Sequence, residues 1–203
     1  VAAGAVILIG AGEKAFSAGA DIQFLNRADP LAVRDLARGA VRVTRRIETL
    51  GKPVIAAING YALGGGLEIA EACTLRVAVR EAKLGHPEVK IGAVAGWGGT
   101  TRLPRLVGRA RAAELLLTGE MITAEEAERI GLVNRVVERA ELRAEAERLA
   151  RAVLANSPSA VRLTWEAMSR GLDLPLEEAA LLGADAFGLV ASTEDYREGT
   201  RAF

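Results

Sequence analysis

Cysteine and histidine are almost missing from this chain of 203 residues, which contains one of each, Cys73 and His86. A single cysteine excludes an internal disulfide and a cysteine-cluster metal site, and a single histidine argues against a histidine-based metal site. We therefore expect no bound metal and a reducing compartment, the cytoplasm.

The chain also lacks an excess of charge and a long apolar run. Its 26 Lys and Arg residues balance 26 Asp and Glu residues, so no net field favours nucleic acid or an anionic membrane. No run reaches the roughly 18 apolar residues of a membrane-spanning helix, and the first residues lack the pattern of a signal peptide. We expect a cytoplasmic protein that does not enter a membrane.

The beginning of the chain is unusual, because it opens with Val1 and passes at once into the apolar run Ala5–Gly12. A buried strand this close to an end normally follows other structure. We therefore expect the sequence to be a segment of a longer polypeptide.

Short apolar runs closed by glycine or polar residues indicate strands in the first two thirds of the chain. The clearest are Ala5–Gly12, Val54–Ile58 and Leu75–Val79, and the first two are typical of strands buried on both faces. Helical patterns separate these runs, for example from Asp29, an N-cap before a proline, to about Leu50. This alternation predicts an α/β fold.

From Arg139 onward the pattern is helical almost to the end, with breaks at Asn156–Pro158 and Gly171–Pro175. We therefore divide the chain into a core, residues 1–138, and a C-terminal helical region, residues 139–203. Because that region is rich in apolar residues and has no strands, it must pack on the core or on another subunit.

Three consecutive glycines, Gly64 to Gly66, stand before a carboxylate at Glu68 in the stretch NGYALGGGLEIAEAC. Such a run costs stability unless backbone must approach another group closely. A strand, a glycine turn and a helix start expose N–H groups to an anion, either a phosphate or an oxyanion formed during a reaction. No phosphate-loop or dinucleotide-binding spacing is present, which weakens the phosphate interpretation. Close packing of a helix on a strand is the alternative.

Glu68 lies about one helical turn past Gly65, so its carboxylate can reach the same place. Its neighbours in the sequence are apolar, and partial burial would raise its pKa into the range useful for proton transfer. A structural or surface role is the alternative for Glu68. We expect Glu71, on the same helix, to face water.

Glu88 is a second acid in a semi-apolar setting, between Pro87 and an apolar run that we expect to be extended. Two such acids would let one activate a water while the other moves a proton, although their spacing alone does not establish this. We expect His86 to be a hydrogen-bonding neighbour that orients Glu88 rather than a catalytic group.

A second glycine-containing loop, AFSAGADI at Ala15–Ile22, follows the first strand as the glycine run follows the second. If the two strands are parallel neighbours, both loops emerge at one sheet edge, where α/β proteins bind ligands. Gly19 and Ala20 could then supply a further N–H donor. Ser17 has neither a nucleophile-elbow motif nor a second histidine to complete a triad, which argues against a serine nucleophile.

Taken together, these motifs resemble the enoyl-CoA hydratase family of the crotonase superfamily. The similarity runs in order through AFSAGADI, KPVIAAINGYALGGGLEIAEAC, LGHPEVKIGAVAGWGGTTRLPRLVG, LLTGEMITAEEAERIGLVNRVV and EDYREGTRAF, which cover nearly the whole chain. It implies a crotonase-like spiral of β-β-α units followed by a C-terminal helical region that forms homotrimers, pairing into hexamers. It also implies that the first strands of the family fold are missing here.

The resemblance implies site residues as well. The oxyanion hole for the thioester carbonyl would be the N–H groups of Ala20 and Gly65, and the catalytic carboxylates would be Glu68 and Glu88. Ala18 and its neighbours would hold the adenine end of coenzyme A, with Lys14 near the phosphates. The full set of implied substrate-binding residues is Lys14, Ala18, Gly19, Asp21, Ile22, Gly64 and Trp97.

The implied reaction is the reversible addition of water to a 2-trans-enoyl-CoA, which gives a 3-hydroxyacyl-CoA. Glu68 would deprotonate the water that attacks C3, and Glu88 would deliver a proton to C2, while the two N–H groups stabilise the enolate. No metal or redox cofactor is implied, because coenzyme A is part of the acyl-CoA substrate. Trp97 would form a wall of the acyl pocket at a usually smaller position, which leaves the acyl-chain length open.

Three alternatives stay open. A 3,2-enoyl-CoA isomerase typically uses a single glutamate at the Glu88 position, so Glu68 argues against it. A catalytically idle assembly protein is suggested by the absent family segments. RNA binding is suggested by arginines at helical spacing, although the zero net charge and the lack of interleaved aromatic residues favour a solvated or coenzyme-facing surface. Those arginines are Arg34, Arg38, Arg42 and Arg45.

Overall fold

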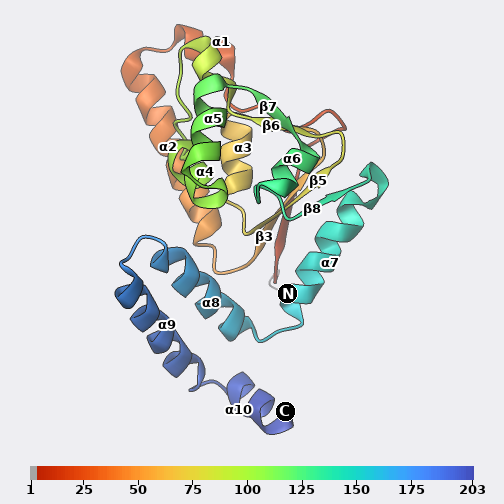
Figure 1. Ribbon diagram of the computed structural model, residues 1–203, viewed down its shortest axis with the longest axis vertical. Coiled ribbons are helices and arrows are strands. Elements are labelled where there is room, and N and C mark those ends of the chain that lie inside the picture. Colours follow the sequence, from red (N-terminus) through yellow and green to blue (C-terminus); the bar gives the residue numbers. More distant parts are fainter. Residues whose placement is uncertain (1–3) are drawn as a thin grey trace. The chain divides into compact units, whose positions relative to one another are not determined.

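The computed structural model describes residues 4–203, which divide into two compact units. One unit is Ala5–Arg148, and the other is Gly4 together with Leu149–Phe203. Figure 1 shows strands and helices intermixed in the first unit and helices alone in Leu149–Phe203. Each unit is described below by itself.

The first unit contains a parallel four-stranded sheet in the order β1-β3-β5-β8. Its strands are β1 (Val6–Ile9), β3 (Val54–Ile58), β5 (Leu75–Val79) and β8 (Arg135–Val137). All five residues of β3 are buried, because this strand has a paired neighbour on each side. The continuous apolar run of β3 is therefore what a central parallel strand requires.

A second sheet has the order β2-β4-β6-β7, parallel except where β6 meets β7. Its strands have three residues each: β2 (Ala15–Ser17), β4 (Tyr61–Leu63), β6 (Lys83–Gly85) and β7 (Met121–Thr123). Each of β2, β4 and β6 follows a strand of the first sheet in the chain, so the backbone alternates between the two sheets.

A helix closes each such pair of strands before the next pair begins. The helices are α2 (Pro30–Glu48), α3 (Gly65–Glu71) and α4 (Gly99–Val107), and a short helix, α1 (Ile22–Arg27), precedes α2. The chain thus repeats strand, strand, helix three times, as the family resemblance implies. The start of α2 is fixed by hydrogen bonds between neighbouring residues, because the Asp29 side chain accepts from the N–H groups of Leu31 and Ala32.

Two expectations about the start of the core are wrong. Ala15–Ile22 is not simply a loop, because its first three residues form β2 and Ile22 begins α1; three residues are too few to show a strand period in the sequence. The first strand is not buried on both faces: Val6 to Leu8 are half-buried, and Ile9 is 53% exposed. The reason is that β1 is an edge strand of the described sheet.

The rest of the first unit is mostly short helices. After β6 comes a 3-10 helix, η1 (Pro87–Ile91), where an extended run was predicted. Helix α5 (Arg109–Thr118) follows α4, and α6 (Ala124–Arg129) follows β7. Thr123 caps α6, because its side chain accepts from the N–H of Glu126.

The remaining elements are helical and are bounded by the predicted breaks. A short 3-10 helix, η2 (Arg139–Glu141), leads into α7 (Leu142–Leu154). The last three helices are α8 (Pro158–Gly171), α9 (Leu176–Val190) and α10 (Glu194–Ala202). Within residues 4–203, no helix is both long and apolar enough to cross a membrane.

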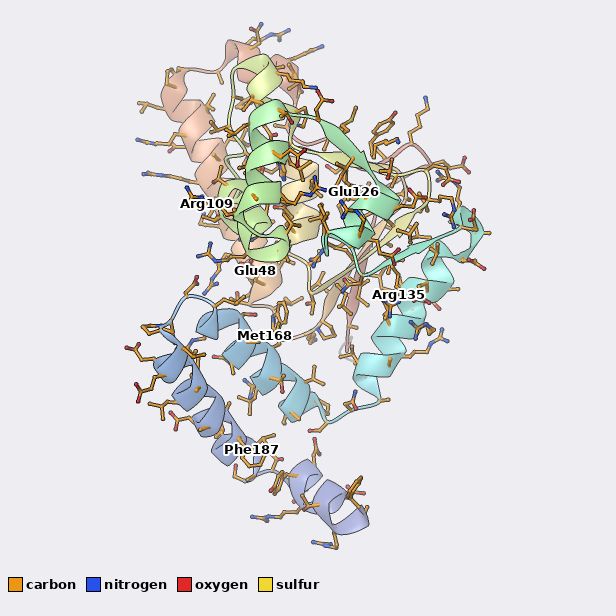
Figure 2. All side chains as sticks on the ribbon, in the orientation of Figure 1. Glu48, Arg109, Glu126, Arg135, Met168 and Phe187 are labelled. Carbon is orange, nitrogen blue, oxygen red and sulfur yellow. The ribbon has the colours of Figure 1, made fainter. Side chains whose placement is uncertain are left out.

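Within the second unit, α8 packs against α9 and the ring of Phe187 meets Tyr196 of α10 edge to face. Many of its large apolar side chains are nevertheless exposed, among them Met168 at 53% and Phe187 at 65%, both labelled in Figure 2. Helix α9 has no buried residue, although its composition is mainly apolar.

One close approach can be tested by substitution. A Cβ atom at Gly66 would overlap the carbonyl oxygen of Ser17, because α3 lies directly against the end of β2. We expect Gly66→Ala to lower the free energy of unfolding by about 1–3 kcal/mol, the usual cost of overpacking a rigid site. Denaturant unfolding measures this, and a variant as stable as the parent would contradict the contact. In the matched control Gly39→Ala, the nearest atom to the new Cβ is Arg42 Nη2 at 3.8 Å. That variant should be slightly stabilised.

Candidate active site

The two glycine-containing loops lie together, as predicted for parallel neighbouring strands. Val6 of β1 pairs with Val54 of β3, so both strands end at the same edge. There the side chain of Asn59 accepts from the N–H of Gly10 and donates to the carbonyl oxygens of Gly10 and Gly12. The Asn59 amide therefore fixes the loop after the first strand onto the turn after the second.

The glycine run forms the turn into α3. Gly64 has a left-handed backbone (φ 53°), and its N–H donates to the carbonyl oxygen of Gly85. Gly65 is the first residue of α3, where N–H groups have no partner inside the helix. Gly19 also has a left-handed backbone (φ 88°), and a Cβ atom there would lie 2.9 Å from the nitrogen of Gly65. The fold therefore places the segment that contains Gly19 next to Gly65.

Glu68 is buried, with 1% of its surface exposed, and its carboxylate is held by backbone donors. Its Oε1 atom accepts from the N–H groups of Trp97 and Gly99, both at 2.7 Å. Burial raises the pKa of Glu68, while those two hydrogen bonds and the nearby His86 oppose the rise. The prediction of a partly buried acid with a raised pKa is confirmed, and its anchors come from a loop that the sequence did not connect to it.

The Trp97 loop is itself fixed from two helices. The carbonyl oxygen of Trp97 accepts from the hydroxyl of Thr44 on α2 and from the guanidinium of Arg102 on α4. Arg102 also forms two hydrogen bonds with Glu48, of 2.6 and 3.0 Å, at the C-terminal end of α2, where Figure 2 labels Glu48. The donors to Glu68 are therefore held in place before any ligand arrives.

Trp97 also lies against the glycine turn. A Cβ atom at Gly65 would overlap Cε3 and Cζ3 of the indole, so the six-membered ring covers the Cα of Gly65. The half-buried indole is thus next to the predicted oxyanion donor. Only glycine at position 65 leaves room for this contact.

Glu88 approaches the same turn from η1, the 3-10 helix that follows β6. A Cβ atom at Gly64 would lie 3.1 Å from Glu88 Oε1, and the Glu88 side chain is 15% exposed. Its other oxygen, Oε2, is a buried atom with no hydrogen-bond partner in the described part of the chain. Glu68 and Glu88 are therefore both placed around Gly64 and Gly65.

Glu71 does not face water, contrary to prediction. Its side chain is fully buried, and Oε1 lies 2.8 Å from Nε2 of His86. The other ring nitrogen of His86, Nδ1, lies 3.7 Å from Glu88 Oε1. One signal could have revealed this: residues three apart share a helix face, so a buried Glu68 implies a buried Glu71.

The other predicted substrate-binding residues lie along the segment from β2 to α1. Lys14, Ala18, Asp21 and Ile22 are exposed, and Ala20 is half-buried. The Asp21 side chain caps α1 by accepting from the N–H groups of Gln23 and Phe24. Ser17 Oγ accepts from the N–H of Gly19, which gives that hydroxyl a role in shaping the loop.

The arginine stripe suggested by the sequence lies on one exposed face of α2. Arg34 is partly neutralised by Asp35, whose carboxylate lies 3.1 Å away. Among residues 4–203, no group of three or more His, Cys, Asp or Glu side chains is arranged to hold a metal ion.

Comparisons with known proteins agree with this geometry. The family model for enoyl-CoA hydratase/isomerase matches residues 2–203. A crotonyl-CoA hydratase of Syntrophomonas wolfei is 46% identical over 198 residues, which cover 98% of this chain and 76% of the relative. An (E)-benzylidenesuccinyl-CoA hydratase of Thauera aromatica is 44% identical, covering 97% and 77%. The crystal structure of an enoyl-CoA hydratase from Bacillus anthracis superposes with a TM-score of 0.94 at 44% identity, covering 98% of this chain and 77% of that one. The chain therefore belongs to the enoyl-CoA hydratase/isomerase family of the crotonase superfamily.

Proposed function

We propose that this chain is a hydro-lyase that adds water reversibly to a 2-trans-enoyl-CoA to give a 3-hydroxyacyl-CoA. The observation that carries the proposal is that two acids lie near one glycine turn. Glu88 Oε1 approaches Gly64, and Glu68 accepts from the N–H of Trp97, whose indole covers Gly65. Membership of the family and the names of its relatives support the same reaction.

The thioester oxygen is assigned to the N–H groups of Ala20 and Gly65. The approach of Gly19 to the Gly65 nitrogen supports this, because it places two short backbone segments next to each other. Donors fixed in advance at a developing enolate oxygen are worth about 100- to 1,000-fold in rate each.

Glu68 is the base that activates water. Its Oε1 is occupied by two backbone donors, so the proton taken from water is assigned to Oε2. The water oxygen then bonds to C3, the electron pair of the C2–C3 double bond moves toward the thioester, and Glu88 donates a proton to C2. Burial raises the pKa of Glu68, which makes its carboxylate a stronger base toward the water.

The outer part of the substrate is assigned to the exposed segment between Lys14 and Ile22. Ala18 and its neighbours would contact the adenine end of coenzyme A, with Lys14 near the phosphates, as the family resemblance implies. We propose no metal or redox cofactor and a cytoplasmic location. A 3,2-enoyl-CoA isomerase is disfavoured because Glu68 is built into the site rather than exposed on the surface.

Substituting either acid tests the reaction. Glu68→Gln and Glu88→Gln should each lower crotonyl-CoA hydration by about 100- to 10,000-fold, because each removes one proton transfer. Binding of coenzyme A should stay nearly unchanged. Hydration is followed by loss of the enoyl thioester absorbance, with Glu114→Gln, on the exposed face of α5, as the control. Parental turnover in either site variant would overturn the two-carboxylate mechanism.

Trp97 is proposed to limit the acyl group, because its indole lies against Gly65 next to the thioester position. Relatives at almost the same identity are named for crotonyl and benzylidenesuccinyl substrates, so membership of the family does not fix this choice. Trp97→Ala should raise kcat/KM for eight- to ten-carbon enoyl-CoA esters relative to crotonyl-CoA by about tenfold or more, the effect of a few added methylene contacts. The backbone donor to Glu68 remains in this variant. An unchanged chain-length profile would show that the indole is not a pocket wall.

We propose that the helical region, residues 139–203, joins copies of the chain into homotrimers that pair into hexamers. Exposed apolar side chains on α8 and α9 support a partner surface there. Leu181→Glu places a charge on this surface, where Leu181 is 60% exposed, and should shift the mass measured by light scattering toward the monomer. Glu178→Gln, on the same helix, should leave the mass unchanged. A monomeric parent chain would contradict the assembly.

A further inference from the structure

The water-adding mechanism does not use the two buried polar residues Glu71 and His86. Their side chains are 0% and 1% exposed, and they lie directly behind Glu88. Burying a carboxylate in a protein interior is costly unless a partner compensates it. Glu71 has such a partner in His86. What remains to be explained is why the second ring nitrogen of His86 is directed at Glu88.

The imidazole ring lies between two carboxylates on different elements. Nε2 is 2.8 Å from Oε1 of Glu71 on α3, and Nδ1 is 3.7 Å from Oε1 of Glu88 on η1. Within residues 4–203, the buried side-chain atoms with no hydrogen-bond partner are Glu71 Oε2, His86 Nδ1 and Glu88 Oε2. All three belong to this cluster, and a shift of less than 1 Å would join His86 to Glu88. A buried nitrogen without a hydrogen bond raises the free energy of the folded state. A protonated Nδ1 that donates to the Glu88 carboxylate is therefore favoured.

The ring also touches the support of the other acid. A Cβ atom at Gly99 would lie 2.8 Å from Cε1 of His86 and 3.1 Å from Cγ of Glu68. Gly99 gives Glu68 one of its two backbone hydrogen bonds. His86 therefore packs between the turn that anchors Glu68 and the carboxylate of Glu88.

The charges around the ring favour a protonated imidazole. Glu68 and Glu71 face it from α3 and Glu88 from η1, while the cations Arg76 of β5 and Arg102 of α4 act on Glu71. Burial opposes a charge on the ring, but the hydrogen bonds and negative charges of Glu71 and Glu88 outweigh it and raise the pKa of His86 to about 10. Burial likewise raises the pKa of Glu71, against the effect of His86. The 2.8 Å contact of Nε2 with Oε1 of Glu71 and the raised pKa of His86 together place the proton on the ring.

We propose that Glu71 and His86 are positioning residues for Glu88: Glu71 keeps the imidazole protonated on both nitrogens, and Nδ1–H holds Oε1 of Glu88. This inference rests on the proposed role of Glu88 as the proton donor to C2. With Oε1 occupied as an acceptor, the proton that Glu88 transfers is carried by Oε2.

The protonation of the ring can be read directly, because His86 is the chain's one histidine and its signals need no assignment. Nitrogen-15 NMR of the full chain should show both ring nitrogens protonated from pH 7 to about pH 9. In Glu71→Gln, which keeps the size of the side chain and removes its charge, the ring should titrate at a lower pH. A neutral imidazole at pH 7 in the parent chain would overturn the proposal.

Kinetics test the effect on Glu88. Glu71→Gln should lower kcat for crotonyl-CoA by about tenfold with little change in KM, the effect of losing one hydrogen bond to a charged group. Its kcat should also fall as pH rises through the lowered pKa of His86, a limb that the parent shows only near pH 10. Glu71→Asp, which keeps the charge, should restore part of the activity and remove that limb.

His86→Gln provides a second route, because a neutral amide cannot titrate. It should lower kcat without a new pH limb, and the double variant with Glu71→Gln should be no slower than His86→Gln alone, since both changes remove one unit. Glu126→Gln, at a partly exposed pair with Arg129 away from this cluster, is the matched control and should keep the parental profile. Thermal unfolding of every variant separates a folding defect from a catalytic one.

The outcomes distinguish the two proposals. If the parent chain does not hydrate crotonyl-CoA, or Glu88→Gln keeps parental turnover, the proposed function fails. If the parent hydrates and Glu88→Gln does not, while Glu71→Gln has the parental kcat and pH profile, only the positioning role fails.

Discussion

The site depends on one close approach of backbone to backbone, at the start of α3. Gly66 lies so near the carbonyl oxygen of Ser17 that no Cβ atom fits between them, and Gly19 meets the nitrogen of Gly65 in the same way. This contact joins the second strand-strand-helix unit, β3 to α3, to the first, β1 to α2. Because of it, two loops about 45 residues apart in the sequence share one edge, and the Trp97 indole can cover Gly65. A larger residue at these glycines would separate the donors that the proposed reaction needs.

Burial of three acids around this contact sets the electrostatics. Each acid is compensated by a different means: Glu68 by the N–H groups of Trp97 and Gly99, Glu71 by the His86 ring, and Glu88 by partial exposure and the nearby imidazole. Carboxylates this close would repel one another if all were charged in a dry interior. Different compensation allows neighbouring acids to hold different protonation states, which a base and an acid acting on one substrate require.

Membership of the family and the features particular to this chain have different consequences. The chain has the fold of the enoyl-CoA hydratase/isomerase family, and relatives of similar identity are named for different acyl groups. Trp97 lies against Gly65, and the Glu71–His86 pair lies next to Glu88. Changes there can alter which substrate is accepted, or how a proton is held, while the spiral of strands and helices stays the same.

The sequence by itself determined the α/β class, the central strands, the helix start capped by Asp29, and the candidate acids Glu68 and Glu88. It could do so because periodicity, capping and glycine turns are local. It missed the three-residue strands β2 and β4, which are too short to show a period, and it placed Glu71 in water. Only the tertiary structure decided that Trp97 and Gly99 hold Glu68, that Thr44 and Arg102 fix the Trp97 loop, and that His86 lies between the carboxylates of Glu71 and Glu88. These contacts join residues tens of positions apart, and the chain specifies them only when its strands pair and bring their ends together.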